Sequence, residues 1–196
     1  MIEWLAPLAL FAFVSSITPG PNNLMLMASG ANFGFARTLP HMLGVGLGFM
    51  LMIVLVGLGI IGLLNQFPLA YDLLLWACTL YLFFLAYKIA TSTSIEGGTE
   101  SSGKPFSFLQ AALFQWVNPK AWTMALTGVT VYAPTQSVES VFAVAIIFGL
   151  INLPSVSSWV VLGQQIRRFL GTAMRLKLFN YLMAVLLLAS VLPTLA

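Results

Sequence analysis

Apolar residues fill six long stretches of the chain, and short polar segments separate them. Because about 20 apolar residues cross the hydrocarbon core of a bilayer, each stretch is long enough to form a transmembrane helix. The predicted spans are residues 4–31, 39–64, 69–90, 108–131, 138–163 and 178–195. The pattern therefore predicts an all-α integral membrane protein with six transmembrane helices.

Proline-containing polar segments interrupt the first and the fourth predicted span. Residues 18–23 are Thr-Pro-Gly-Pro-Asn-Asn, and residues 118–120 are Asn-Pro-Lys. Proline removes a backbone hydrogen bond and clashes with the preceding turn, so we expect both helices to break at mid-membrane. Asn118 can cap the restarted fourth helix, and Thr18 or Gly20 can cap the restarted first helix.

A polar segment, residues 91–107, divides the chain into halves of about residues 1–90 and 108–196, each with three predicted spans. Because three is an odd number, related halves would be inverted relative to one another in the membrane. Each half begins with its broken helix, and broken helices at corresponding positions indicate a midplane substrate site in secondary transporters. We therefore predict a single transmembrane domain, residues 1–196, of two inverted three-helix repeats joined by a cytoplasmic linker.

Basic residues fall on one side of the predicted membrane. They are Arg37, Lys88, Lys104, Arg167, Arg168, Arg175 and Lys177. The opposite side carries Glu3, Asp72 and Glu139. The positive-inside rule then places the basic side in the cytoplasm and both termini on the outer, periplasmic side. In a five-span alternative the last stretch lies on the membrane surface and the C-terminus is inside, although residues 178–192 carry no charge.

The composition narrows the class of protein further. Of the 196 residues, 60% are hydrophobic and 7% are charged, whereas a soluble domain carries about a quarter charged residues. Eight Lys and Arg residues in all weigh against a nucleic-acid interface. One cysteine, Cys78, and one histidine, His41, which we expect at the cytoplasmic edge of the second span, are too few for a disulfide or a zinc site. We therefore expect no enzyme, no cofactor and no metal.

The two breaks predict a site for a zwitterion. A half-helix N-terminus carries unpaired N–H groups and about half a positive charge, which favours a carboxylate. Carbonyls freed upstream of the prolines, and asparagine side chains, can accept hydrogen bonds from an ammonium group. The candidate substrate-binding residues are Thr18, Gly20, Pro21, Asn22, Asn23, Asn118, Pro119, Lys120 and Asn152.

Three of the polar residues within the spans have two possible roles each. Lys120 lies near the middle of a span, where burying a charge costs about 2.5–3.5 kcal/mol on insertion scales. Lys120 would hold a substrate carboxylate, or it would neutralise the C-terminal end of a neighbouring half-helix. Asn152 lines the same cavity or makes an interhelical hydrogen bond. Asp72, near the outer edge of the third span, is the candidate coupling group or an ordinary interface charge.

Three segments, in this order, resemble the LysE/RhtB family of amino-acid exporters: Ile17–Asn23, Gly34–Arg37 and Gln115–Ala121. The resemblance covers essentially the whole chain, including the number of spans and the long loop after the third span. The doubled asparagine at the end of the first segment and the stretch Tyr87–Ser92 are similar to the branch that exports cysteine and O-acetylserine. The family's signature positions correspond here to Gly20, Pro21, Asn22, Asn118, Pro119 and Lys120.

The resemblance implies a multi-pass secondary transporter in a bacterial inner (plasma) membrane. It would export an amino acid or a close derivative by alternating access, with protons as the coupling ion. Because no predicted span carries a carboxylate at mid-depth, we expect a neutral substrate such as cysteine, O-acetylserine, threonine, homoserine or leucine, and not a polyamine or a metal cation. The alternative is an uncoupled channel or facilitator for small neutral solutes, and a homodimer is the candidate assembly.

Overall fold

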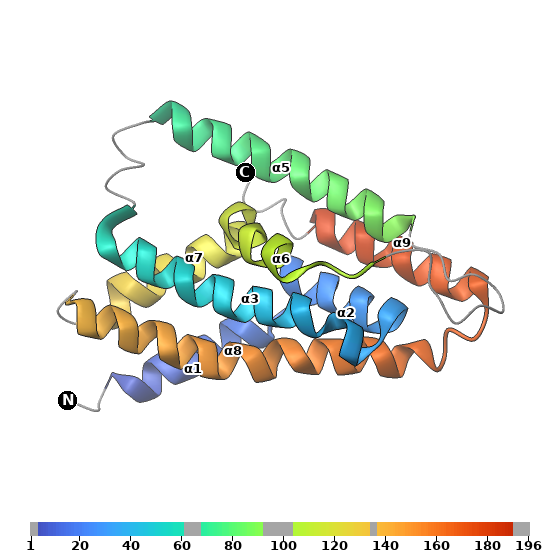
Figure 1. The fold of residues 1–196 in the computed structure, drawn as a ribbon, viewed down its shortest axis with the longest axis horizontal. Coiled ribbons are helices and arrows are strands. Elements are labelled where there is room, and N and C mark those ends of the chain that lie inside the picture. The colour runs from blue at the N-terminus through green and yellow to red at the C-terminus, as the bar shows by residue number, and fades with distance from the viewer. Residues whose placement is uncertain (1–3, 61–67, 92–103, 134–136, 190–196) are drawn as a thin grey trace.

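The chain folds into an elongated bundle of helices (Figure 1). The computed structural model describes residues 4–60, 68–91, 104–133 and 137–189. Within residues 68–79 it describes the backbone and, of the side chains, that of Trp76 alone. Its elements are α1 (Leu5–Ile17), α2 (Pro21–Phe33), α3 (Phe35–Leu55), η1 (Val56–Ile60), α5 (Pro68–Ala90), α6 (Phe108–Phe114), η2 (Gln115–Val117), α7 (Pro119–Tyr132), α8 (Val138–Arg167) and α9 (Ala173–Ala189). Helices are the regular structure of these described ranges, as predicted.

Both predicted helix breaks are present. The first predicted span consists of α1 and α2, and the fourth consists of α6, η2 and α7. Pro21 is the first residue of α2 and follows Gly20, whose backbone is extended; Pro119 is the first residue of α7 and follows Asn118. Proline fits this position because its missing N–H would have no partner there. By contrast, Pro154 lies inside α8 and does not end it.

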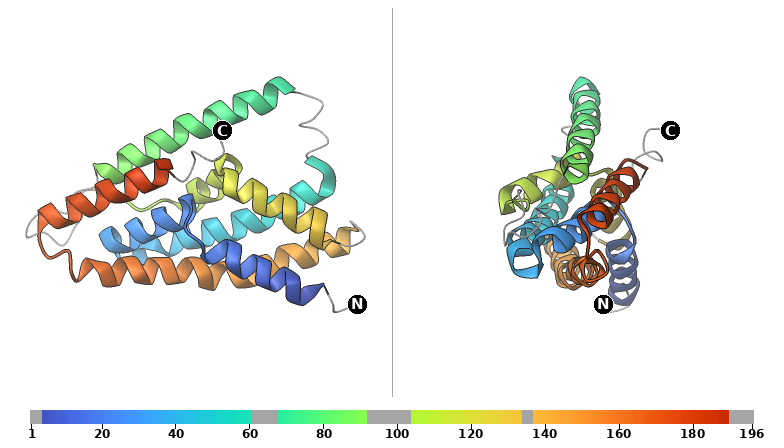
Figure 2. Two further views of the ribbon diagram at one scale, coloured as in Figure 1. Left: turned by 180° about the vertical axis from the view of Figure 1, so that it is seen from behind. Right: turned by 90° about the vertical axis from the view of Figure 1, so that its right-hand side faces the viewer.

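Helix α8 forms one long side of the bundle, as two opposite views show (Figures 1 and 2). It packs against α1, α2 and α3. Glycines bring α2 and α8 into backbone contact, because a side chain at Gly163 would collide with the carbonyl of Met27. A side chain at Gly30 would likewise collide with the carbonyl of Val160. The long helix therefore holds both halves of the broken first span in place.

The second broken span is held in a similar way. The Gly44-x-x-x-Gly48 spacing in α3 is typical of close helix packing, and α3 does pack closely against α6. A Cβ atom at Gly48 would lie 2.5 Å from the Cα atom of Ala112. Beyond the break, the buried ring of Phe148 contacts Phe11 and Phe49 edge to face, with centroids 5.9 and 5.4 Å apart. This apolar core lies between α1, α3, α7 and α8 and joins the first broken span to the second.

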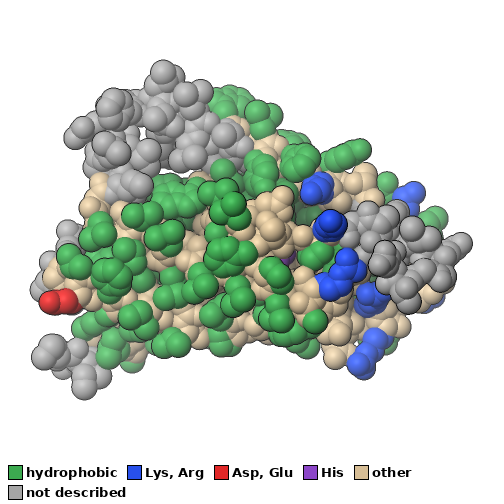
Figure 3. Space-filling model, viewed as in Figure 1, with side chains coloured by type: hydrophobic (Ala, Val, Ile, Leu, Met, Phe, Trp, Pro, Cys, Tyr) green, Lys and Arg blue, Asp and Glu red, His purple; other side chains and the backbone are tan. Residues whose placement is uncertain are grey.

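The outer surface carries an apolar band. The outward side chains of α3 include Leu39, Leu43, Leu47 and Leu51, which lie four residues apart and so share one helix face. In Figure 3, hydrophobic side chains cover the middle of the visible face, Lys and Arg side chains gather toward one end, and an acidic side chain lies at the other. A band of this kind suits contact with lipid.

Two described helices are long and apolar enough to cross a membrane by length and composition: Phe35–Gly59 and Val138–Arg167. Shorter apolar helices are Leu5–Ile17, Leu80–Ala90 and Phe108–Val117. Two of the shorter segments are halves of the broken spans, which explains why neither reaches full length alone. The six-span inverted repeat stays a prediction, because parts of the second and sixth predicted spans lie outside the described residues.

Candidate functional site

The two breaks meet, and Lys120 joins them. Its ammonium group, in the first turn of α7, donates to the carbonyl oxygen and the hydroxyl of Thr18, at 2.8 and 2.9 Å, and to the carbonyl of Pro19 at 3.3 Å. Thr18 is the C-cap of α1. The last carbonyls of a helix have no partner within it and carry partial negative charge, so a cation is stabilised there. Of the two roles predicted for Lys120, this geometry favours the counter-ion of a half-helix.

Asn23 closes the same break from the other side. Its side-chain amide donates to the carbonyl of Ser16 at 2.8 Å and to that of Thr18 at 2.7 Å. The carbonyls freed at the break, which the sequence assigns to a substrate ammonium group, therefore already have donors from Asn23 and Lys120. Asn23 therefore stabilises the C-terminal end of α1 through these two hydrogen bonds.

Asn22 and Gln115 form a reciprocal amide pair between the two broken helices. The amide nitrogen of Asn22 donates to Gln115 at 2.8 Å, and that of Gln115 donates back to Asn22 at 3.2 Å. Gln115 is fully buried and also donates to the carbonyl of Ala111. Gln115 belongs to the segment Gln115–Ala121 that resembles the exporter family, but it is not among the binding residues predicted from the sequence.

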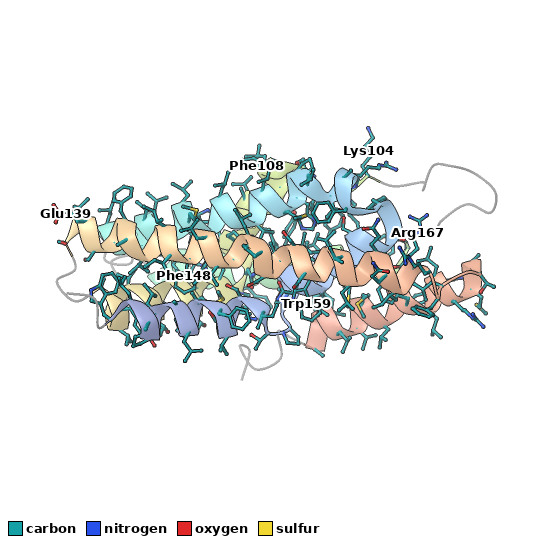
Figure 4. All side chains as sticks on the ribbon, turned by 90° about the horizontal axis from the view of Figure 1, so that it is seen from below. Lys104, Phe108, Glu139, Phe148, Trp159 and Arg167 are labelled. Atoms are coloured by element: carbon teal, nitrogen blue, oxygen red, sulfur yellow. The ribbon has the colours of Figure 1, made fainter. Side chains whose placement is uncertain are left out.

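Asn152 of α8 has one open hydrogen-bonding atom. Its amide nitrogen donates to the hydroxyl of Ser16 at 3.1 Å, whereas its carbonyl oxygen, Oδ1, is buried and has no hydrogen-bond partner among the described residues. Leaving a buried acceptor unpaired costs about 1–3 kcal/mol. Nearby, the indole of Trp159 donates to the carbonyl of Ile17 at 3.0 Å, so α8 also fixes the end of α1 (Figure 4). Oδ1 is thus an acceptor available to a ligand.

These groups surround one small polar cavity. Of the predicted binding residues, the cavity is lined by Gly20, Asn22, Asn23, Asn118, Lys120 and Asn152. Ser16 and Gln115, which the sequence does not single out, line it as well. Thr18 lies beside it through its bond to Lys120. The free volume is about 20 Å³, which is room for about one water molecule.

The two half-helix N-termini differ in how they are capped. The side chain of Asn118 accepts a hydrogen bond from the backbone N–H of Lys120 at 3.2 Å, so α7 is capped by its own chain, as predicted. Gly20 has no side chain, and α2 therefore begins without a side-chain cap. An uncapped helix N-terminus that borders a polar cavity favours an anionic group. The N-terminus of α2 is the better place for a carboxylate.

Replacing Asn118 by alanine tests the cap. We expect the variant to lose about 1 kcal/mol of stability, because alanine cannot accept from the first turn of α7. Thermal unfolding in detergent measures this, and Asn118→Ser, which retains a capping oxygen, is the matched control. A loss of transport far larger than this loss of stability would contradict a role limited to capping.

Two further predicted residues lie elsewhere. Asp72 falls in the first turns of α5, and its side chain is outside the described part of the chain, so its coupling role stays a prediction. His41 is 1% exposed in the second turn of α3. The structure adds that α3 turns this side chain toward Phe106 and the interior of the bundle, while its place at the cytoplasmic edge of the second span stays a prediction.

Comparison with known proteins identifies the chain. The family described as LysE type translocator matches residues 13–191. The cysteine/O-acetylserine efflux protein of Escherichia coli (strain K12) is 30% identical over 160 residues, 81% of each chain. The protein of that name from Shigella flexneri serotype 5b (strain 8401) is 30% identical over 171 residues, 84% of this chain and 87% of the relative. No solved structure matches. The resemblance seen in the sequence is thus confirmed, and this chain belongs to the LysE type translocators, a family of membrane transport proteins and not of enzymes.

Proposed function

We propose that this protein exports a neutral amino acid or a close derivative from the cytoplasm, with cysteine and O-acetylserine as the preferred substrates. The names of its relatives support this substrate class, and so does the polar cavity between the breaks. The observation that carries the proposal is the Oδ1 of Asn152, which has no partner among the residues that the structure describes and lies in a cavity that the uncapped N-terminus of α2 also borders. Threonine, homoserine and leucine have the same zwitterionic backbone and are the next candidates.

In this proposal each end of the zwitterion has a partner. The carboxylate lies at the N-terminus of α2, where the Lys120 side chain packs against Gly20 and Asn22 follows in the first turn. The ammonium group donates to Oδ1 of Asn152 on α8. Lys120 does not bind the substrate in this state, because its ammonium group already has three acceptors at the α1–α2 break. It holds the break in the geometry that the carboxylate needs.

The size of the cavity favours alternating access over a permanent channel. A free volume of about 20 Å³ does not admit an amino acid, so the helices around it must move for a substrate to bind. The proposed movement is between the two inverted halves, around the midplane site. An uncoupled facilitator would need an open path past Asn152 and Lys120, and the hydrogen bonds that join the two breaks support a closed site instead.

The remaining parts of the proposal are the orientation in the membrane, the coupling ion and the assembly. The basic end lies in the cytoplasm and both termini lie on the outer side of a bacterial inner membrane, by the positive-inside rule. Protons drive export, with Asp72 as the candidate coupling group, and the protein works as a single chain or a homodimer.

A substrate panel tests the proposed function. Proteoliposomes loaded with cysteine, O-acetylserine, threonine, leucine, lysine or a polyamine are assayed for efflux with and without an imposed pH gradient. We expect the neutral amino acids to leave in a gradient-dependent way, with cysteine and O-acetylserine fastest, and lysine and the polyamine to be retained. Efflux that ignores the gradient, or that is equal for all solutes, would contradict a coupled amino-acid exporter and favour the facilitator.

A further inference from the structure

A second and larger cavity lies at the basic end of the molecule. Its volume is about 560 Å³, within the range of about 300–1,000 Å³ that is usual for ligand pockets. Helices α2, α3 and α5 and the segment before α6 form its walls. Figure 4 places Lys104, a lining residue, at the same end as Arg167, with Glu139 at the far end. The central site described above does not use this cavity.

The cavity contains a buried side chain with no partner. His41 is 1% exposed, and neither ring nitrogen has a hydrogen-bond partner among the described residues. A neutral imidazole offers one N–H donor and one nitrogen acceptor. The ring of Phe106 lies close to it, edge to face, with the centroids 5.2 Å apart. The wall of this cavity therefore holds one buried donor and one buried acceptor that are unpaired within the described part of the chain.

The same cavity presents cations without carboxylates. The ammonium group of Lys88 lies 5.9 Å from the ring centroid of Phe106 and 5.6 Å from that of Phe84. Lys104 lines the cavity from the segment before α6, and the described lining includes no Asp or Glu. Because Phe106 contacts both His41 and Lys88, the ring lies between a neutral acceptor and a cation. This arrangement fits a small molecule with a carboxylate at one end and an ammonium group at the other.

One face of α2 leads from this cavity to the central one. Asn22 lines the central cavity, whereas Met25, Ser29 and Asn32 line the larger one. Their spacing of three or four residues places all four on one side of the helix. The Asn22–Gln115 pair lies at the central end of this face. The larger cavity is therefore in position to deliver a ligand to the central site.

We propose that the larger cavity is a second amino-acid binding site, a loading vestibule in which Lys88 and Lys104 bind the substrate carboxylate and His41 accepts from its ammonium group. The proposal rests on the proposed export function for the identity of the ligand. Loading there precedes transfer along α2 to the central cavity. His41 sets the preference for zwitterions over simple anions, because an anion without an ammonium group leaves its acceptor unpaired.

Protection of a reporter thiol tests the vestibule separately from transport. Thr91 lines the larger cavity one turn after Lys88, so Thr91→Cys in a Cys78→Ser background places a single thiol at the site. The probe is O-acetyl-L-serine, which has no thiol, and the reagent is a membrane-impermeant maleimide. At ten times its dissociation constant, the probe is expected to slow labelling about tenfold. Serine methyl ester, which lacks the carboxylate, is expected to give no protection.

Substitutions in the reporter protein show which residues bind the protecting amino acid. Lys88→Gln and His41→Phe are each expected to raise the half-protecting concentration about tenfold, whereas His41→Gln, which retains an acceptor, is expected to restore most of the affinity. Arg175→Gln is the matched control, because Arg175 is an exposed cation near the same end that contacts the carbonyl of Phe169 and not the cavity. An equal effect of Arg175→Gln would overturn the assignment.

A second variant of the reporter protein distinguishes a failure of the proposed vestibule from a failure of the proposed export function. In the reporter protein with Asn152→Leu added, which removes the central acceptor, protection by O-acetylserine is expected to persist. Loss of protection in the Asn152→Leu protein would show that only the central site binds the amino acid, and it would overturn the vestibule. Export of O-acetylserine by a reporter protein that shows no protection would also overturn the vestibule. Protection without export of any amino acid would support the vestibule and overturn the exporter instead.

Discussion

Replacing Lys120 by methionine is expected to reduce export by about 10- to 150-fold while the protein still folds and inserts into the membrane. A hydrogen bond to a charged group contributes about 1.5–3 kcal/mol, and each 1.36 kcal/mol corresponds to a factor of ten. Methionine keeps most of the apolar stem of lysine, although it is one atom shorter, and it cannot donate to Thr18 or Pro19. The α1–α2 break then loses the contact that joins it to α7. Export from proteoliposomes measures the effect.

Two companion variants show how Lys120 acts. Lys120→Arg keeps the charge and is expected to retain part of the activity. Thr18→Val removes one of the three acceptors, so its effect in combination with Lys120→Met is expected to be smaller than the sum of the two single effects. Additive effects would indicate that Lys120 contacts the substrate and not the break. Wild-type export by Lys120→Met would contradict both roles.

Replacing Asn152 by leucine is expected to raise the KM for O-acetylserine at least about tenfold with little change in folding, because a hydrogen bond from an ammonium group contributes about 1.5–3 kcal/mol. Leucine has a similar volume, and it removes a buried acceptor that has no hydrogen-bond partner within the described part of the chain. Initial rates of export over a range of internal substrate concentrations give KM and maximal rate separately.

Ser16→Ala is the matched control for Asn152. It removes the hydroxyl that accepts from the amide nitrogen of Asn152 but leaves Oδ1 in place. If Oδ1 accepts from the substrate, Ser16→Ala retains a KM near that of the wild type. Equal effects of Ser16→Ala and Asn152→Leu would instead indicate that the bond between α1 and α8 is what matters, and would remove Asn152 from the binding site.

The helix breaks could be predicted from the sequence because their causes are local. Proline restricts its own backbone and lacks an N–H, so Pro21 and Pro119 mark helix starts wherever the rest of the chain lies. The cap at Asn118 is equally local, since its side chain reaches the N–H two residues on. Gly44 and Gly48 indicate close packing, although only the structure shows that the partner is α6.

The partners of the polar side chains could not be predicted, because they depend on which helices pack together. Lys120 and Thr18 are 102 residues apart, and no periodicity in either helix indicates the other. Gln115 and Ser16 have no charge and no special backbone role, so nothing in their local sequence separates them from other polar residues in a span. His41 follows a polar, arginine-containing turn, which suggests an interface, yet Phe106 from the distant segment before α6 covers it.

A counterflow assay tests most directly whether the protein transports an amino acid by alternating access through the cavity between the breaks. Proteoliposomes loaded with unlabelled O-acetylserine are diluted into a trace of the labelled compound with no ion gradient. We expect the wild type to accumulate label transiently above equilibrium, because a carrier returns with substrate bound, and Asn152→Leu to lose this overshoot. Label that only equilibrates, with no overshoot and no dependence on Asn152, would contradict the account and indicate a channel.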